Sequence, residues 1–249
     1  MSNTTDDTFR ANDDGLLASA HAWHICPNDV DRAMLRQEYL RWLAPDEADH
    51  LGKFLTEPLQ HQYLLTRALC RDTLSRCADV DPAAWRFSKN ESGKPRIDSP
   101  VQFRDLHFNL THTAGLIVCL VTRAGKVGID AEEITRPVDA DQIASHFFSE
   151  AEQALLSRLD GPRTTRFYEQ WVLKEAYLKG CGEGFSRSPE AFTISRDHRA
   201  RPLPLDQWQF TLHHPTPQHV AAAAIRPDGA AGVIPVLWRA SASFLRQKC

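Results

Sequence analysis

The chain contains no apolar run near the ~20 residues needed to cross a bilayer, and Met1–Asp14 lack the basic and apolar regions of a signal peptide. Its six cysteines form no CxxC or cysteine–histidine pattern, which argues against a structural zinc site. A large charge of one sign is also missing: the net charge is −3 over 249 residues, so binding to nucleic acid or to a membrane surface is not indicated. These absences predict a soluble cytoplasmic protein with reduced thiols.

Two segments carry closely spaced charged residues. The first, Gly128–Glu132, has the alternation of a strand, so Asp130 and Glu132 project from one face. The second, Trp171–Lys179, fits a helix and puts Glu175 and Lys179 one turn apart on a shared face. If the two faces meet, three carboxylates and one ammonium share a site, which is unfavourable unless a cation lies among the carboxylates. Oxygen ligands of this kind suit Mg²⁺, which retains waters and binds substrate phosphates.

Two further motifs precede these segments, Gly93-Lys94-Pro95 and Asn109-Leu110-Thr111-His112. In this order the four motifs resemble the signature of the 4′-phosphopantetheinyl transferase superfamily, and in particular its larger, Sfp-type branch. Each short motif is weak alone, whereas four in order make a specific match. The resemblance covers the chain from about Arg67 to Phe185.

Fold class follows from the periodicity and from the resemblance. A helix is predicted after Pro58, running to about Cys77, and the apolar run Leu116–Val121 predicts a buried strand. A Phe-x-Leu-x-His pattern before that run recurs about a hundred residues later, before Val220–Ile225. The resemblance implies an α/β (α+β) protein made of two pseudo-symmetric subdomains from an internal duplication, each with a long helix on a small, mostly antiparallel sheet. We expect a flexible terminus over 1–19, an N-terminal subdomain over 20–126 and a C-terminal subdomain over 127–249.

The resemblance implies an enzyme, a holo-[acyl-carrier-protein] synthase that transfers the 4′-phosphopantetheine arm of coenzyme A to a serine of an apo carrier protein and releases 3′,5′-ADP. Asp130, Glu132 and Glu175 would hold Mg²⁺, and Mn²⁺ is expected to substitute for it. Lys179 would offset charge that builds in the transition state. The proton acceptor for the serine is Glu175 or a water held by the metal.

The resemblance also implies contacts with coenzyme A, which the N-terminal subdomain would provide around the 3′-phosphate. Arg67 suits bidentate phosphate binding, although Arg71 lies one turn away on the same helical face. Turn N–H groups beside a glycine can cradle an anion. The expected contacts are Arg67, Lys89, Asn90, Glu91, Ser92, Gly93, Lys94, Pro95, Asn109, Leu110, Thr111, His112, Asp130, Glu175 and Lys179.

The expected partner is an apo acyl carrier protein or a peptidyl carrier domain, docked on the segment 135–166, which is rich in Phe, Leu and Arg. That segment also fits an ordinary amphipathic helix pair. A monomer is expected because one chain would contain both halves of the site. Two other functions stay open: a coenzyme A-binding module without catalysis, and a Mg²⁺-dependent hydrolase that cleaves the pyrophosphate with water.

Overall fold

The computed structural model describes residues 13–158, 161–182, 188–194, 207–229 and 232–241. In the first part of the chain the elements are α1 (Asp13–Ala18), β1 (Ala20–Ile25), α2 (Arg32–Tyr39), α3 (Pro45–Leu51), α4 (Glu57–Ala78), β2 (Arg86–Lys89), β3 (Pro95–Ser99), β4 (His107–Thr113) and β5 (Leu116–Thr122). The second part contains β6 (Gly125–Glu133), α5 (Ala140–Phe147), α6 (Glu150–Arg158), α7 (Arg163–Cys181), β7 (Gln209–Thr216), β8 (His219–Pro227) and β9 (Val236–Ala240). No helix within these ranges is long and apolar enough to cross a membrane.

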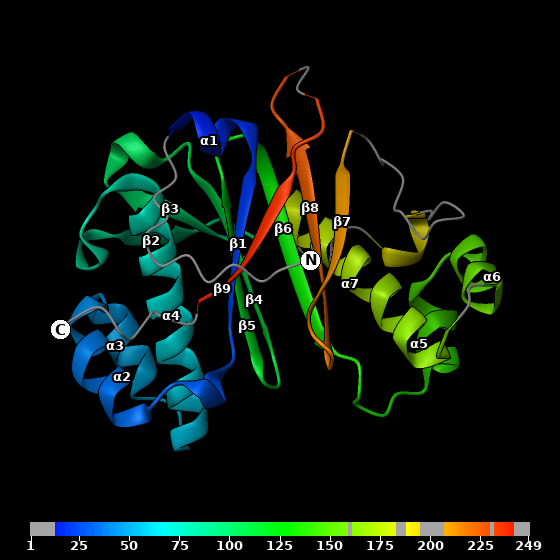
Figure 1. Cartoon of the computed structure of the whole chain (residues 1–249), viewed down its shortest axis with the longest axis horizontal. Coiled ribbons are helices and arrows are strands. Elements are labelled where there is room, and N and C mark those ends of the chain that lie inside the picture. Colours follow the sequence, from blue (N-terminus) through cyan, green and yellow to red (C-terminus); the bar gives the residue numbers. More distant parts are fainter. Residues whose placement is uncertain (1–12, 159–160, 183–187, 195–206, 230–231, 242–249) are drawn as a thin grey trace.

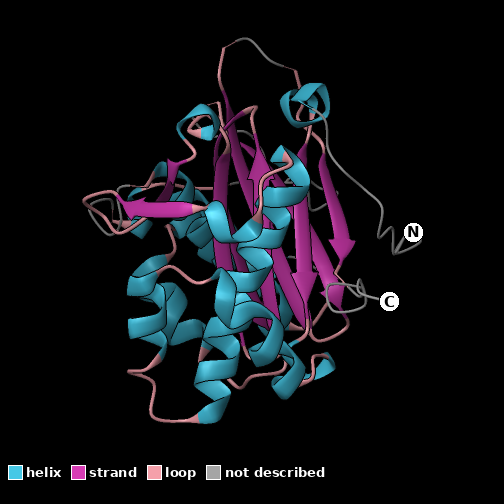
Figure 2. Cartoon of the chain, turned by 90° about the vertical axis from the view of Figure 1, so that its left-hand side faces the viewer, coloured by secondary structure: helices cyan, strands magenta, loops and turns pink. Residues whose placement is uncertain are grey.

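The strands form two sheets between two long helices (Figure 1). One sheet has the order β4-β5-β1-β9 and the other β6-β8-β7, while β2 and β3 make a separate hairpin. Helix α4 lies on the outer side of the first sheet and α7 on the outer side of the second, as Figure 1 shows. Figure 2 looks from the side of α4 and shows helices in front of the strands. The mixed α/β architecture predicted from the sequence is confirmed.

The two halves repeat one arrangement. Strands β4, β5 and β1 are antiparallel neighbours, and β7, β8 and β6 are antiparallel neighbours in the corresponding order. The hairpins β4–β5 and β7–β8 carry the two copies of the sequence pattern that recurs. Each sheet packs its outer face on one long helix, and an apolar layer of small and β-branched side chains separates the sheets. Sharing one layer lets two thin units bury both faces of each sheet.

Two features differ from the expected boundaries. Strand β9 pairs in parallel with β1, with Ala20 opposite Val236, so the end of the C-terminal part completes the sheet of the N-terminal part. Helix α1 falls inside the terminus expected to be flexible, and Leu16 is fully buried there. The Leu16 carbonyl accepts hydrogen bonds from Thr122 Oγ1 (2.9 Å) and Arg123 N (3.0 Å), which fixes the helix at the C-terminal end of β5. Residues 1–12 of that terminus lie outside the described ranges.

Strand β6 and helix α7 approach each other closely because two glycines meet at their crossing. A Cβ atom added to Gly128 would lie 2.0 Å from Ala176 O and 2.3 Å from the Gly180 nitrogen. A larger residue at Gly128 would force the helix away from the strand, while one at Gly180 would meet the Trp208 ring at 2.5 Å. This close contact brings the C-terminal turns of α7 beside the strand that carries Asp130 and Glu132.

Candidate functional site

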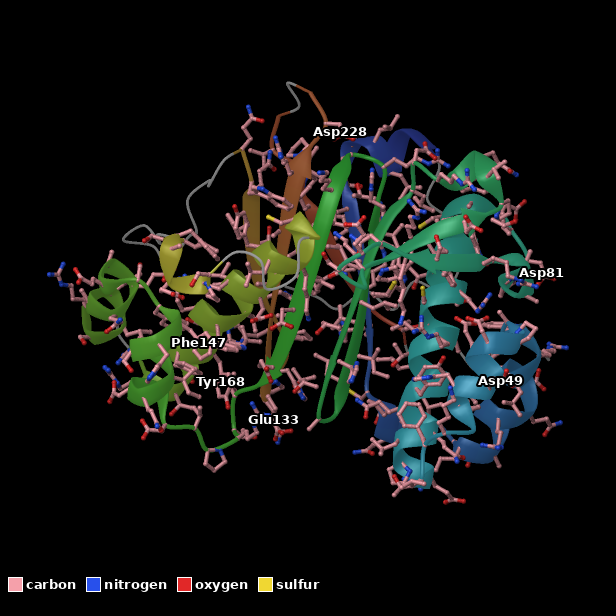
Figure 3. All side chains as sticks on the ribbon, turned by 180° about the vertical axis from the view of Figure 1, so that it is seen from behind. Asp49, Asp81, Glu133, Phe147, Tyr168 and Asp228 are labelled. Atoms are coloured by element: carbon pink, nitrogen blue, oxygen red, sulfur yellow. The ribbon has the colours of Figure 1, made fainter. Side chains whose placement is uncertain are left out.

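The candidate site lies where β4 of the first sheet runs beside β6 of the second (Figure 3). Side chains of β4 bridge this seam, because every second residue of the strand faces β6. Three hydrogen bonds cross it in register: Ile129 N donates to Asn109 Oδ1 (2.8 Å), Thr111 Oγ1 to Asp130 Oδ1 (3.1 Å), and Thr113 Oγ1 to Glu132 Oε2 (3.2 Å).

Helix α7 adds the ammonium of Lys179 to this seam. Its Nζ lies 2.6 Å from Asp130 Oδ1 and 3.1 Å from Thr111 Oγ1. Lys179 therefore pairs across the seam with Asp130 and forms no ion pair with Glu175, its neighbour one turn earlier. The Glu175 carboxylate makes no hydrogen bond or ion pair with any residue that the structure describes.

The three carboxylates are coupled electrostatically. Burial raises the pKa of Asp130, in spite of the nearby Lys179 ammonium. Burial and then the negative charge of Asp130 raise the pKa of Glu132 and of Glu175. Each carboxylate would be stabilised as an anion by one more positive charge placed among them.

The donor atoms suit a hard divalent cation. Asp130 Oδ2 is buried and accepts no hydrogen bond within the described part of the chain, so it has an unused lone pair at the centre of the cluster. Among the described residues, no three or more His, Cys, Asp or Glu side chains lie together as a group that could hold a metal ion. Mg²⁺ needs few protein ligands, because waters and substrate phosphates fill its remaining positions. The carboxylates therefore fit this ion as a partial set of ligands.

Two neighbouring grooves lie near the cluster, and they share part of their lining. One, of about 300 Å³, is bordered by Glu175, Leu178 and Lys179 of α7 and by the β2–β3 turn. The other, of about 310 Å³, lies against α4. They share the lining residues Gly93, Pro95, Asn109 and Leu110. A single elongated ligand can therefore run from α4 to the acidic cluster.

The end of the groove at α4 has positive charge. Arg67, Lys89 and His112 line it, and the Arg67 guanidinium lies 5.3 Å from the centroid of the Tyr63 ring. Arg71 is fully buried and donates to Glu47 and to the carbonyls of Pro82 and Trp85 (2.9 Å each). Its guanidinium is buried in the interior and borders no groove, so of the two arginines only Arg67 borders this one.

The β2–β3 turn contributes unevenly to the grooves. Gly93 and Pro95 line both grooves, Ser92 and Lys94 line only the groove beside α7, and Glu91 borders neither. Asn90 lines a separate cavity, which Lys94 also borders.

The contact of Thr113 with Glu132 was not predicted from the sequence. Thr113 is two residues beyond Thr111, and strand alternation places both side chains on the same face.

Residues 135–166 form the outer side of the second half. Phe148 and Leu156 are buried against α7, whereas Phe147 is 38% exposed and packs its ring edge on Trp171. Figure 3 labels Phe147 and Tyr168 on this helical side, and Glu133 at the end of β6. Arg158 is exposed at the last turn of α6. Among the described residues of this surface, the Phe147 ring and the Arg158 guanidinium are thus accessible.

Comparisons with known proteins give consistent relatives. Residues 126–225 match the 4′-phosphopantetheinyl transferase superfamily, and residues 31–124 match the N-terminal region of 4′-phosphopantetheinyl transferases. The chain is 29% identical over 218 residues to the 4′-phosphopantetheinyl transferase HetI of Nostoc sp., a match that covers 86% of this chain and 90% of that protein. It is 32% identical over 170 residues to the 4′-phosphopantetheinyl transferase Sfp of Bacillus subtilis, covering 66% of this chain and 73% of Sfp.

A solved structure with a partial likeness is a holo-(acyl-carrier-protein) synthase from Bacillus anthracis in complex with CoA (3′,5′-ADP). It is 23% identical to this chain, with a TM-score of 0.36. The match covers 42% of this chain and 96% of that one.

Proposed function

Because the chain belongs to the 4′-phosphopantetheinyl transferase superfamily, we propose that it transfers the 4′-phosphopantetheine arm of coenzyme A to a serine of an apo carrier protein. In this reaction the serine Oγ–phosphorus bond forms, the bond from phosphorus to the leaving oxygen breaks, and 3′,5′-ADP is released. The observation that carries the proposal is the pair of neighbouring grooves, one with cationic side chains at α4 and the other beside Glu175 and Lys179 of α7, where Lys179 contacts Asp130.

Coenzyme A has phosphate groups that such a groove can bind at separate places. We assign the 3′-phosphate to Arg67, Lys89 and His112, because they line one end together and each can donate hydrogen bonds to an anion. The pyrophosphate would then reach the acidic cluster at the other end. Gly93 has a φ of 83° and no Cβ, so backbone can approach a ligand there.

The acidic cluster would supply the chemistry. Asp130, Glu132 and Glu175 would hold Mg²⁺, which when bound offsets the charge of the pyrophosphate and makes the phosphorus more electrophilic. Lys179 adds a second positive charge at a fixed place, since Asp130 and Thr111 hold its Nζ. Charge that builds on the phosphate oxygens in the transition state would be offset without rearrangement of the site.

Glu175 is positioned to accept the proton of the attacking serine. Its carboxylate makes no hydrogen bond or ion pair within the described residues, so it has an oxygen that can accept a proton. A water in the cluster is the alternative acceptor. Holding the serine and the phosphorus in line is the remaining requirement, which the narrow groove meets by restricting the substrate.

We further propose that the carrier protein docks on 135–166. Carrier proteins are generally acidic, so the exposed Arg158 would steer the encounter while Phe147 offers an apolar contact. Arg158→Glu should raise KM for the carrier and leave KM for coenzyme A unchanged. The matched control is Arg32→Glu on α2, at the opposite end of the molecule (Figure 1). Equal rises in both KM values would refute docking at this surface.

We expect the protein to act in the cytoplasm. We also expect a monomer, because one chain supplies both β4 and β6, the two strands of the seam. Sedimentation should give a single species at the monomer mass with one coenzyme A site per chain. An obligate dimer with sites between chains would contradict this expectation.

The transfer itself is tested by mass spectrometry of purified apo carrier proteins incubated with Mg²⁺ and coenzyme A. A gain of one phosphopantetheine on the carrier serine, with equimolar 3′,5′-ADP, is the expected result. Release of 3′,5′-ADP without any carrier would instead indicate a hydrolase. Coenzyme A binding with no product in either case would indicate a binding module.

A further inference from the structure

The turn between β2 and β3 reaches across to the second half of the molecule. Lys94 Nζ donates to Val127 O (2.7 Å) and Gly180 O (3.0 Å), and Asn90 Nδ2 donates to Gly182 O (2.9 Å). The Asn90 side chain also accepts from Lys94 N (2.8 Å), which ties the two residues together. The last carbonyls of a helix have no partner within it, so these side chains cap the C-terminal end of α7. A cation at that end also complements the helix dipole.

The position of this contact relates it to the site. Gly180 directly follows Lys179 on α7, and Val127 is three residues before Asp130 on β6. The Lys94 ammonium thus joins the two backbones at the crossing where the glycines meet. A displacement of the last turn of α7 would move Lys179 away from Asp130, with which it now makes a 2.6 Å contact.

The surroundings of Lys94 argue against direct binding of a phosphate. An ammonium has three donors, and two of them are occupied by carbonyls that belong to different elements. Burial lowers the pKa of Lys94 to about 8, as expected for a side chain withdrawn from water. Lys89, at the end of β2, is exposed and lines the groove at α4, so its ammonium can turn toward an anion there, whereas the Lys94 ammonium is held by two carbonyls.

We propose that Lys94 and Asn90 are positioning residues that hold the last turn of α7 against β6 and so set the placement of Lys179 and Asp130. The expected change in kcat rests on the proposed function, whereas the expected change in amide hydrogen exchange does not. The role differs from the coenzyme A contact expected for both residues from the sequence.

The test compares Lys94→Met, Lys94→Arg and Asn90→Ala with a matched control, Lys126→Met, an exposed lysine on β6. Amide hydrogen exchange over residues 178–182 should accelerate about tenfold or more in Lys94→Met, since a buried hydrogen bond to a charged group is worth at least that factor. It should accelerate less in Asn90→Ala, which removes one neutral bond, and Lys94→Arg should restore part of the protection. The control should behave as the native chain.

Binding and turnover complete the test. The Kd for coenzyme A should change less than about threefold in Lys94→Met, while kcat falls about tenfold or more, because only the transition-state contact of Lys179 is misplaced. A Kd weakened about tenfold with unchanged exchange at 178–182 would overturn the proposal and make Lys94 a phosphate ligand. If the native protein modified no carrier, the proposed function would fail, and the exchange comparison would still decide whether Lys94 and Asn90 hold α7.

Discussion

Lys174 and Lys179 are five residues apart in one helix, yet their removal should have different consequences. Lys174 is buried: its Nζ donates to Glu152 Oε2 (2.6 Å) and Phe192 O (2.9 Å), and it lies 4.2 Å from the centroid of the Phe192 ring. Lys179 is one-third exposed and contacts the candidate site. Lys174→Met should therefore lower the free energy of unfolding, whereas Lys179→Met should lower kcat.

The size of the stability loss follows from what remains around Glu152. Removing one partner of a buried ion pair costs about 3–5 kcal/mol, because the other charge is left without compensation. Glu152 would keep three donors at 2.8–2.9 Å: the Ser149 and Ile194 amides and the Gln170 side chain. These bonds continue to stabilise the carboxylate, so we expect the lower end, about 3 kcal/mol. For a chain of this size that corresponds to a Tm about 6–12 °C lower.

Urea unfolding of both variants and the native protein measures the stability difference, and kcat is measured at a temperature where all three are folded. Lys179→Met should unfold within about 1 kcal/mol of the native protein. A loss below about 1 kcal/mol in Lys174→Met would refute the reasoning, since the buried pair would then contribute no more than a surface pair. A folded Lys174→Met with collapsed kcat would also contradict the division of roles.

Three further outcomes are expected. EDTA should abolish transfer and Mg²⁺ or Mn²⁺ should restore it, because the inferred ligands are all oxygens; restoration by Zn²⁺ alone would contradict this donor set. Arg67→Ala should raise KM for coenzyme A with little change in kcat, since its contact is made in both ground and transition states; a kcat collapse at saturating coenzyme A would count against that role. Burial lowers the pKa of His21 and of His24 from 6.5 to about 4, so both side chains are neutral in the folded protein at pH 7. Arg239 donates a hydrogen bond to His21 Nδ1, which the neutral ring can accept. Because the unfolded chain binds more protons below about pH 6.5, this stability is complete above that pH and is lost as the pH falls toward 4; equal urea midpoints at about pH 7.5 and about pH 5 would contradict it.

Features set by local periodicity could be predicted from the sequence. Strand alternation placed Asp130 and Glu132 on one face, and helical spacing did the same for Glu175 and Lys179. The long helix α4 and the buried strand β5 were found in the same way, because neighbours along the chain decide which face is apolar. The motifs also indicated that the two faces meet, and the structure brings Lys179 to 2.6 Å from Asp130.

Features that depend on partners distant in sequence could not be predicted. Nothing in the residues of β9 indicates that Val236 pairs with Ala20, because strand pairing carries no signal at that separation. The break between α5, which ends at Phe147, and α6, which begins at Glu150, likewise depends on the core, because the chain turns there so that Phe148 is buried. The direction of the Lys94 side chain likewise depends on carbonyls of β6 and α7, which a turn motif does not specify.

The central claim is that the Asp130–Glu175 cluster carries out the chemistry. The most direct test is kcat for Asp130→Ala and Glu175→Ala with one apo carrier protein, after circular dichroism confirms that each variant is folded. Glu133→Ala, at the end of the same strand (Figure 3), is the matched control and should leave kcat unchanged. The account predicts that both site variants lose at least ~100-fold in kcat, the scale for removing one strong electrostatic element. Near-normal kcat in Asp130→Ala and Glu175→Ala would contradict it.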